Sequence, residues 1–213
     1  LENNKITFDR IGSSGTWGNL SFKFPTSSNS ILDNVEVKNG SGIMCSLSAN
    51  VTIKNSIIDH CTEGVLVNTH ASLTMSYCDV NYAQIGIKAE NGGSVNISNI
   101  NLNNCANNAI ALLGFNNEDS NQSFLTPTIK GCNIVGSTIG ISAVNCNEVV
   151  IKDNILSQCN LGIYLNQVNS SYITTNTILG LQSGTGSTMP GIFMSSSGGF
   201  IRNNTIRYHN YGA

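Results

Sequence analysis

The chain repeats itself every 22 residues, and few folds other than a stack of similar coils can accommodate such a repeat. The clearest marker is a glycine followed by isoleucine or valine, with Ala109-Ile110 as a degenerate copy. The full copies are Gly42-Ile43, Gly64-Val65, Gly86-Ile87, Gly140-Ile141, Gly162-Ile163 and Gly191-Ile192. Each repeat of a solenoid packs mainly against the repeats before and after it, so the pattern predicts one elongated array of coils.

A second, independent marker keeps the same period. An apolar residue is followed three positions later by what is usually a small or amide residue, and five positions later by another apolar residue. The copies begin at Ile53, Met75, Ile97, Ile129, Ile151, Ile173 and Ile201. Four of the six steps between them are 22 residues. The two longer steps contain candidate loop insertions near 115–125 and 184–190.

Within each copy apolar and polar residues alternate, as in Val51-Thr52-Ile53, which is the period of a β-strand. A strand about every seven residues, closing every 22, predicts an all-β coil with three sides. The chain has 32 Asn and 21 Gly, residues that favour tight corners over helices. Disorder is the alternative for so polar a chain, but the evenly spread apolar residues weigh against it.

Stacking the coils turns equivalent apolar positions into continuous inward columns, which we expect to form the core. The expected columns are Val51, Leu73, Val95 and Val149; then Ile53, Met75, Ile97, Ile129, Ile151, Ile173 and Ile201; then Val65, Ile87, Ile141, Ile163 and Ile192. The amide residues Asn154, Asn176 and Asn204 share one repeat position and predict a buried hydrogen-bonded ladder. Surface turn asparagines are the alternative.

This pattern resembles the right-handed parallel β-helix repeats of the pectate-lyase-like superfamily over residues 30–213. The resemblance implies one right-handed, three-sided parallel β-helix domain spanning 1–213. Residues 1–29 are expected to form irregular first coils, before regular coils over 30–213. Family members usually begin with a capping helix, and no helical pattern is visible here. We therefore interpret the chain as part of a longer protein.

Seven cysteines raise the question of disulfides, which the repeat register answers. Cys61, Cys105 and Cys159 share one column but lie two coils apart from each other, roughly 9.6 Å by strand spacing and beyond the reach of a disulfide. Cys78 and Cys132 are separated in the same way, whereas Cys45 and Cys146 are placed at corners. Buried free thiols are expected, and the lack of a Cys-x-x-Cys pair disfavours metal binding.

Charge and hydropathy exclude several classes of partner. Charged residues make up 10% of the chain and its net charge is −2, which does not suit nucleic-acid binding. No apolar run approaches the length of a membrane span, and the first residues lack a signal-like apolar region. We expect no cofactor and no metal. A calcium site at Asn116-Asn117-Glu118-Asp119 is an alternative to a plain polar loop.

The motifs of enzymes with this fold do not match. Pectin hydrolases of this fold carry paired Asp with Gly-His-Gly, epimerases carry Asp-Pro-His, and lyases use Arg or Lys with acidic calcium ligands. The best remaining cluster is Asp59, His60 and Glu63 on one coil with Lys88 on the next. Two carboxylates flanking a bond could act as acid and base. A solvated polar corner is the alternative interpretation.

Outward aromatic residues provide the other functional signal. Tyr164 and Phe193 are predicted to lie on consecutive coils, as are Tyr172 and Phe200. Aligned exposed rings suit stacking on sugars, and Asn166 and Gln167 could bond sugar hydroxyls. The alternative is that other parts of the protein cover these rings.

The sequence thus predicts a non-catalytic carbohydrate-binding module for a neutral, xylan-type plant polysaccharide. It resembles the few β-helix modules that bind such chains without cutting them. We expect a secreted bacterial protein, joined to a glycan-degrading catalytic domain or a surface domain. A polysaccharide lyase or hydrolase using Asp59, Glu63 and Lys88, and a passive stalk, are the alternatives.

Overall fold

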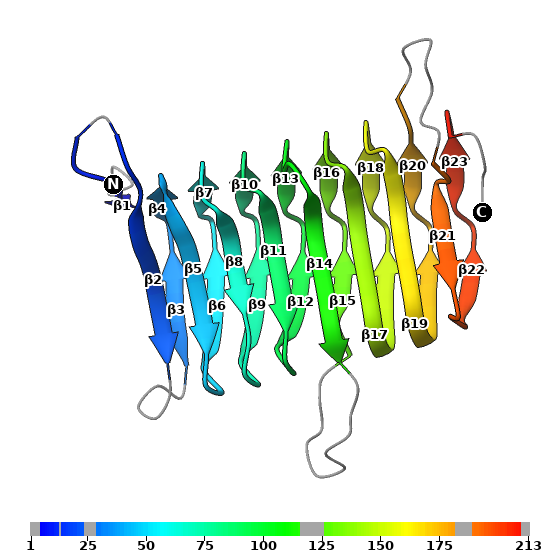
Figure 1. Ribbon diagram of the computed structural model, residues 1–213, viewed down its shortest axis with the longest axis horizontal. Coiled ribbons are helices and arrows are strands. Elements are labelled where there is room, and N and C mark those ends of the chain that lie inside the picture. The colour runs from blue at the N-terminus through cyan, green and yellow to red at the C-terminus, as the bar shows by residue number, and fades with distance from the viewer. Residues whose placement is uncertain (1–4, 13, 24–28, 116–125, 182–188, 210–213) are drawn as a thin grey trace.

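The structure is a computed structural model that describes residues 5–12, 14–23, 29–115, 126–181 and 189–209. Within these residues there is no helix, and every strand pair is parallel. Successive coils stack along the long axis of the molecule (Figure 1). The predicted all-β parallel solenoid with a 22-residue coil is confirmed, because Ile53 pairs with Met75 and Met75 with Ile97.

Each coil contributes one strand to each of three faces. Face 1 contains β1 (Ile6–Phe8), β4 (Val35–Lys38), β7 (Ile57–Asp59), β10 (Asp79–Asn81), β13 (Asn101–Asn103), β16 (Asn133–Val135), β18 (Ile155–Ser157), β20 (Thr177–Leu179) and β23 (Thr205–Arg207). Face 2 contains β2 (Trp17–Lys23), β5 (Gly40–Ser46), β8 (Glu63–Val67), β11 (Ile85–Glu90), β14 (Asn108–Phe115) and β21 (Ile192–Ser195). Face 3 contains β3 (Ser30–Asp33), β6 (Asn50–Lys54), β9 (Ser72–Ser76), β12 (Ser94–Ser98), β15 (Thr128–Lys130) and β22 (Phe200–Arg202). The long strands β17 (Ile139–Lys152) and β19 (Leu161–Thr174) continue from face 2 onto face 3.

The predicted inward columns form the core. The column from Ile53 to Ile201 is in register throughout, across both loop insertions. All its members are fully buried except Ile201, which is 44% exposed because no described strand pairs with the far side of β22. Each buried aliphatic side chain contributes roughly 1.5 to 3 kcal/mol, and a single coil has too few of them to fold alone.

All seven cysteines are buried and none forms a disulfide, as the register argument predicts. The corner placement of Cys45 and Cys146 is wrong. Cys45 lies within β5 and pairs with Val67, and Cys146 lies within β17 and pairs with Val168. Both side chains point into the core, because the strands of face 2 extend farther along the coil than the repeat pattern indicates.

Two stacked corners in each coil account for some of the asparagines of the chain. The corner between faces 1 and 2 places Asn39, His60, Tyr82, Asn104 and Gln158 in the left-handed region, with φ between 51° and 56°. Asparagine tolerates this region better than most residues. The backbone N–H of each corner residue donates to a carbonyl of the next coil, as His60 does to Asn81 at 3.0 Å. The corner between faces 3 and 1 repeats this arrangement from Asn34 to Asn203.

The predicted amide ladder is present at the corner between faces 3 and 1. Asn154 and Asn176 are buried, and the side-chain oxygen of each accepts the backbone N–H of the residue one coil earlier. Asn204 continues the ladder by accepting from the backbone N–H of Asn176 at 2.8 Å. These three side chains satisfy polar groups that would otherwise be buried without partners.

The beginning of the chain is more regular than irregular first coils would be. Residues 6–33 contain β1, β2 and β3, and each of these strands pairs in register with the following coil. The connection between β1 and β2, residues 9–16, is longer than its counterpart between β7 and β8, residues 60–62. The candidate calcium loop at 116–119 and most of the two loop insertions, 116–125 and 184–188, lie outside the described residues.

Candidate functional site

The first predicted aromatic pair lies on the outer surface of face 2. Tyr164 on β19 pairs in register with Phe193 on β21, and their ring centroids are 5.7 Å apart with an angle of 6° between the planes. Phe193 is 43% exposed, and Tyr164 is half-buried. Two nearly parallel rings on consecutive coils form one continuous aromatic strip that runs along the solenoid axis.

The side chains around this strip are uncharged. Asn166 lies two residues beyond Tyr164 on the same side of β19 and pairs in register with Ser195. Gln167 is exposed at the next corner, with a φ of 55°. On the preceding coil, Ser142 pairs with Tyr164 and accepts a hydrogen bond from Asn108 at 2.8 Å. The strip is therefore bordered by amide and hydroxyl groups.

The second aromatic pair lies on face 3. Tyr172 pairs with Phe200, and their ring centroids are 5.6 Å apart with an angle of 21° between the planes. Tyr172 is 39% exposed and Phe200 is 65% exposed. The two pairs thus share strand β19 but belong to different faces, so each presents its own surface to a ligand.

Lys88, from the predicted catalytic cluster, belongs to the same outward column as the first aromatic pair. The column continues in register from Lys88 through Ala111 and Ser142 to Tyr164 and Phe193. Three coil steps separate Lys88 from Tyr164, which is about 14 Å at the usual strand spacing. On face 2, Lys88 and its carboxylates therefore lie about three coils before the Tyr164–Phe193 strip.

The structure divides the predicted catalytic cluster into two groups. The Lys88 ammonium lies 2.9 Å from a carboxylate oxygen of Glu90 and 3.4 Å from one of Glu63. Asp59 instead contacts the neighbouring His60, whose Nδ1 is 2.9 Å from the Asp59 carboxylate. The His60 ring stacks on Tyr82 with centroids 4.8 Å apart. Among the described residues, no hydrogen bond or ion pair joins the two groups.

The environment of Lys88 does not favour a role as a general base. The hydrogen bond to Glu90 raises the pKa of Lys88 above its ordinary value, and the nearby charge of Glu63 acts in the same direction. A lysine that removes a proton near neutral pH needs a lowered pKa. The arrangement has the chemistry of a surface ion-pair cluster.

The described residues contain no group of three or more His, Cys, Asp or Glu side chains that could hold a metal ion. They also contain no helix that is long and apolar enough to cross a membrane.

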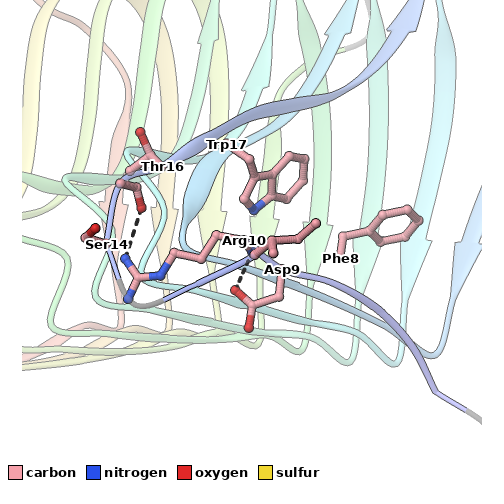
Figure 2. Close-up of a pocket in the computed structure, with 8 residues that line it drawn as sticks. Phe8, Asp9, Arg10, Ser14, Thr16 and Trp17 are labelled. Carbon is pink, nitrogen blue, oxygen red and sulfur yellow. Dashed lines mark hydrogen bonds between the residues drawn. The ribbon is translucent and has the colours of Figure 1, made fainter.

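A pocket that the sequence analysis did not anticipate lies at the N-terminal end of the solenoid. It has a volume of about 400 Å³ and is formed by the loop between β1 and β2 together with the flanking residues Phe8 and Trp17. Figure 2 shows the Arg10 side chain extending along this loop toward Ser14, with the Phe8 and Trp17 rings nearby. None of the predicted site residues lines the pocket. The one indication of this pocket in the sequence was Trp17, the only tryptophan.

The polar groups of this pocket are used to hold the loop in place. The indole Nε1 of Trp17 donates to the Lys38 carbonyl at 2.6 Å, and its ring covers Gly40 so closely that a Cβ there would lie 2.6 Å from the ring. Arg10 donates to the Gly15 carbonyl at 3.0 Å. Asp9 accepts from Asn39 at 2.9 Å, a bond that lowers the pKa of the Asp9 carboxyl. The contacts of Trp17 and Asp9 thus fix the loop of this pocket to the following coil.

A basic row on face 3 was also missed. Lys130 and Lys152 are in register on consecutive coils, and Arg202 occupies the same column two coils later. Each of the three directly follows the core isoleucine of its repeat, so the sequence repeat alone could have identified the row.

A protein-family model described as a right handed beta helix region matches residues 1–118 and 85–213, which together span the chain. No curated protein and no solved structure matches the chain. The model match agrees with the stacked coils and adds their right-handed winding. It carries no information on activity, because this family includes both enzymes and non-enzymes.

Proposed function

The chain belongs to the right-handed β-helix family, and from that premise we propose that it binds a polysaccharide along face 2 without cleaving it. The single observation that carries this proposal is the partly exposed Tyr164–Phe193 strip. Aromatic rings at a protein surface pack well against the apolar C–H groups of a ligand, and neighbouring polar groups fix its orientation.

The direction of the strip supports a polymer as the ligand. The ring centroids follow each other at 5.7 Å along the axis, so a sugar chain lying parallel to the axis can contact both rings. Half-buried apolar side chains, among them Leu113 and Val144 on neighbouring coils of face 2, extend the apolar surface beyond the rings. Asn108 and Asn166 are within the same surface and supply amide groups for hydroxyls.

The charge around the strip supports a neutral ligand of the xylan type. The side chains beside the strip are uncharged: Asn166, Gln167 and Ser195. Lys88 lies about three coils from the strip, and its charge is paired with two carboxylates. A bacterial protein that binds plant polysaccharides must reach them outside the cell. The proposal therefore includes a secreted bacterial protein, in which this domain is joined to a catalytic domain that degrades the glycan or to a surface domain.

Affinity electrophoresis in gels containing xylan tests the proposal. We expect the gel to retard the wild-type protein. Tyr164→Ala and Phe193→Ala should each lose about 1 to 3 kcal/mol of binding free energy, if stacking on a sugar resembles stacking on a base. Tyr77→Asn is the matched control, because Tyr77 is also exposed but lies at a corner with positive φ, which asparagine tolerates. No retardation by any neutral glycan would overturn the proposal and leave the stalk alternative.

An assay for reducing ends and unsaturated products on the same polysaccharides tests the non-catalytic part. We expect no turnover, because Lys88 is held protonated between carboxylates. Turnover that disappears in Glu63→Ala would establish the enzyme alternative.

A further inference from the structure

We propose that the C-terminal half of face 3 carries a second, separate site that binds an anionic polysaccharide through the Tyr172–Phe200 pair and the basic row Lys130, Lys152 and Arg202. This site is distinct from the one on face 2 in place and in ligand charge. Either proposal can therefore fail without the other.

The register places the cations beside the rings. Tyr172 and Phe200 form one outward column of face 3, which continues from Val150 on the preceding coil. The adjacent outward column, two residues farther along each strand, contains Lys130, Lys152, Thr174 and Arg202 on consecutive coils. Alternate residues of a strand point to the same side of the sheet, so the charged and aromatic columns share one surface. Lys152 and Arg202 are two coil steps apart, about 10 Å.

The cations of this row are open to a ligand, whereas three lysines of earlier coils are paired with carboxylates. Lys38, Lys54 and Lys88 each lie within 3.2 Å of a carboxylate oxygen. Among the described residues, no carboxylate lies within ion-pair distance of Lys130 or Arg202, and both side chains are exposed. Two unpaired cations in one column beside a pair of exposed rings indicate a surface for an anionic ligand.

Lys152 has only a distant partner. Its ammonium is 3.9 Å from the carboxylate of Asp153, which also accepts a hydrogen bond from the Thr175 hydroxyl. Asp153 occupies the corner next to face 3, with a φ of 56°, rather than the face itself. A ligand carboxylate or sulfate at face 3 can therefore contact Lys152 without displacing Asp153.

One carboxylate, Glu148, lies on the C-terminal half of face 3 and limits where the ligand can run. Glu148 is in the outward column on the other side of Val150, and it accepts a hydrogen bond from Thr126 at 2.7 Å. The aromatic column lies between Glu148 and the basic row. An anionic chain on the basic row is therefore separated from this carboxylate. The local balance is still positive. Residues 126–209 contain Lys130, Lys152, Arg202 and Arg207 against Glu148 and Asp153, whereas the whole chain has a net charge of −2.

The combination of rings and cations favours an acidic sugar chain over other anions. A small inorganic anion would make no use of the Tyr172 and Phe200 rings. Three cations with a carboxylate nearby are too few to bind the closely spaced phosphates of a nucleic acid well. A sugar that carries a carboxylate or a sulfate offers an apolar ring surface and a charge within one unit. Guanidinium and ammonium groups bind both kinds of anion.

The experiment compares two variants that remove cations from different faces of the same protein. Lys152→Gln/Arg202→Gln removes the proposed contacts, and Lys38→Gln/Arg207→Gln removes the same net charge from face 1. Binding of both variants and of the wild type is measured at low and high salt with polygalacturonate, dextran sulfate, xylan and single-stranded poly(dT). The two acidic polymers distinguish carboxylate from sulfate as the preferred anion.

We expect the face 3 variant to lose about tenfold or more in affinity for at least one acidic polymer, with a weaker salt dependence. The face 1 variant should change by less than about threefold, and xylan binding should be the same in all three proteins. Equal losses in the two variants would show non-specific attraction and overturn the proposal. Absence of binding to both acidic polymers, or tighter binding to poly(dT), would also overturn it. Tyr172→Ala should weaken the same polymer without changing the salt dependence, and an unchanged affinity there would remove the rings from the site.

Discussion

The side-chain amide of Asn154 donates to Oδ1 of Asn176 at 3.0 Å, and the backbone N–H of Asn154 donates to the same oxygen, also at 3.0 Å. One side chain thus satisfies two donors of the preceding coil. The amide group of Asn176 in turn donates to the Ile151 carbonyl at 3.0 Å. Each ladder asparagine therefore ties two neighbouring coils together at a buried corner.

Replacing Asn176 should be among the most damaging single changes in the chain. Asn176→Ala leaves the backbone N–H of Asn154 and the Ile151 carbonyl buried without these partners, and each such group costs about 1 to 3 kcal/mol. We expect the free energy of unfolding, measured by urea denaturation, to fall by about 3 kcal/mol or more. Asn101→Ala is the control, since Asn101 forms an exposed ladder bond to Asp79 at 2.7 Å. A loss of similar size in both variants would contradict a special role for the buried ladder.

The glycine of the repeat marker allows consecutive coils to approach closely. A Cβ at Gly162 would lie 2.4 Å from the Gly191 carbonyl oxygen and 2.5 Å from a methyl carbon of Ile178. We expect Gly162→Ala to reduce the free energy of unfolding by about 1 to 3 kcal/mol through overpacking. Gly18→Ala should be nearly neutral, because a Cβ there meets nothing within 4 Å. Equal thermal midpoints for the two variants would show that the packing around Gly162 relaxes freely.

The repeat made most of the fold predictable. Two markers with one period determine which residues are neighbours between coils, and the Ile151–Ile173 and Tyr164–Phe193 pairings follow from that alone. Where strands begin and end is less well determined, because β17 and β19 continue through the corner between faces 2 and 3 without a break in the ladder. This is why Cys45 and Cys146 were assigned to corners although they lie in strands.

The candidate site was only partly predictable. The register identified the aromatic pairs. The separation of Asp59 from Lys88 depends on which neighbours their side chains contact, and a repeat pattern does not determine this. The pocket beside Trp17 was missed because its loop, 9–16, occurs in the first coil only and so leaves no periodic signal.

Lys88 should stabilise the fold through its two carboxylates. Its pKa is raised in the folded protein, mainly by the Glu90 hydrogen bond, so this contribution is complete below the unfolded pKa of about 10.4 and is lost as the pH rises through the folded value. We expect Lys88→Gln to lower the free energy of unfolding at pH 7 by about 0.5 to 1 kcal/mol, and less in high salt. A difference that persists unchanged above pH 11 would contradict the ion-pair explanation.

The buried thiols should make the protein sensitive to alkali. Burial raises the pKa of Cys45 to about 12 and those of Cys78, Cys105 and Cys132 to about 11. These thiols stay protonated in the folded state at pH 9, whereas in the unfolded chain they ionise with a pKa of about 8.5. Ionisation therefore stabilises the unfolded state by about 0.8 kcal/mol per thiol at pH 9, and the stability present at pH 7 declines as the pH rises above about 8.5.

Cys105→Ala tests this effect with little disturbance, because Ala83 already occupies the same column one coil earlier. Urea denaturation at pH 7, 8 and 9 should show a steep fall in the wild type and a fall smaller by about 0.8 kcal/mol in the variant. A thiol reagent should modify the native protein far more slowly than the unfolded chain, since all seven cysteines are buried. Stability that is constant from pH 7 to 9, or rapid modification of the native thiols, would contradict the buried, protonated state on which this prediction depends.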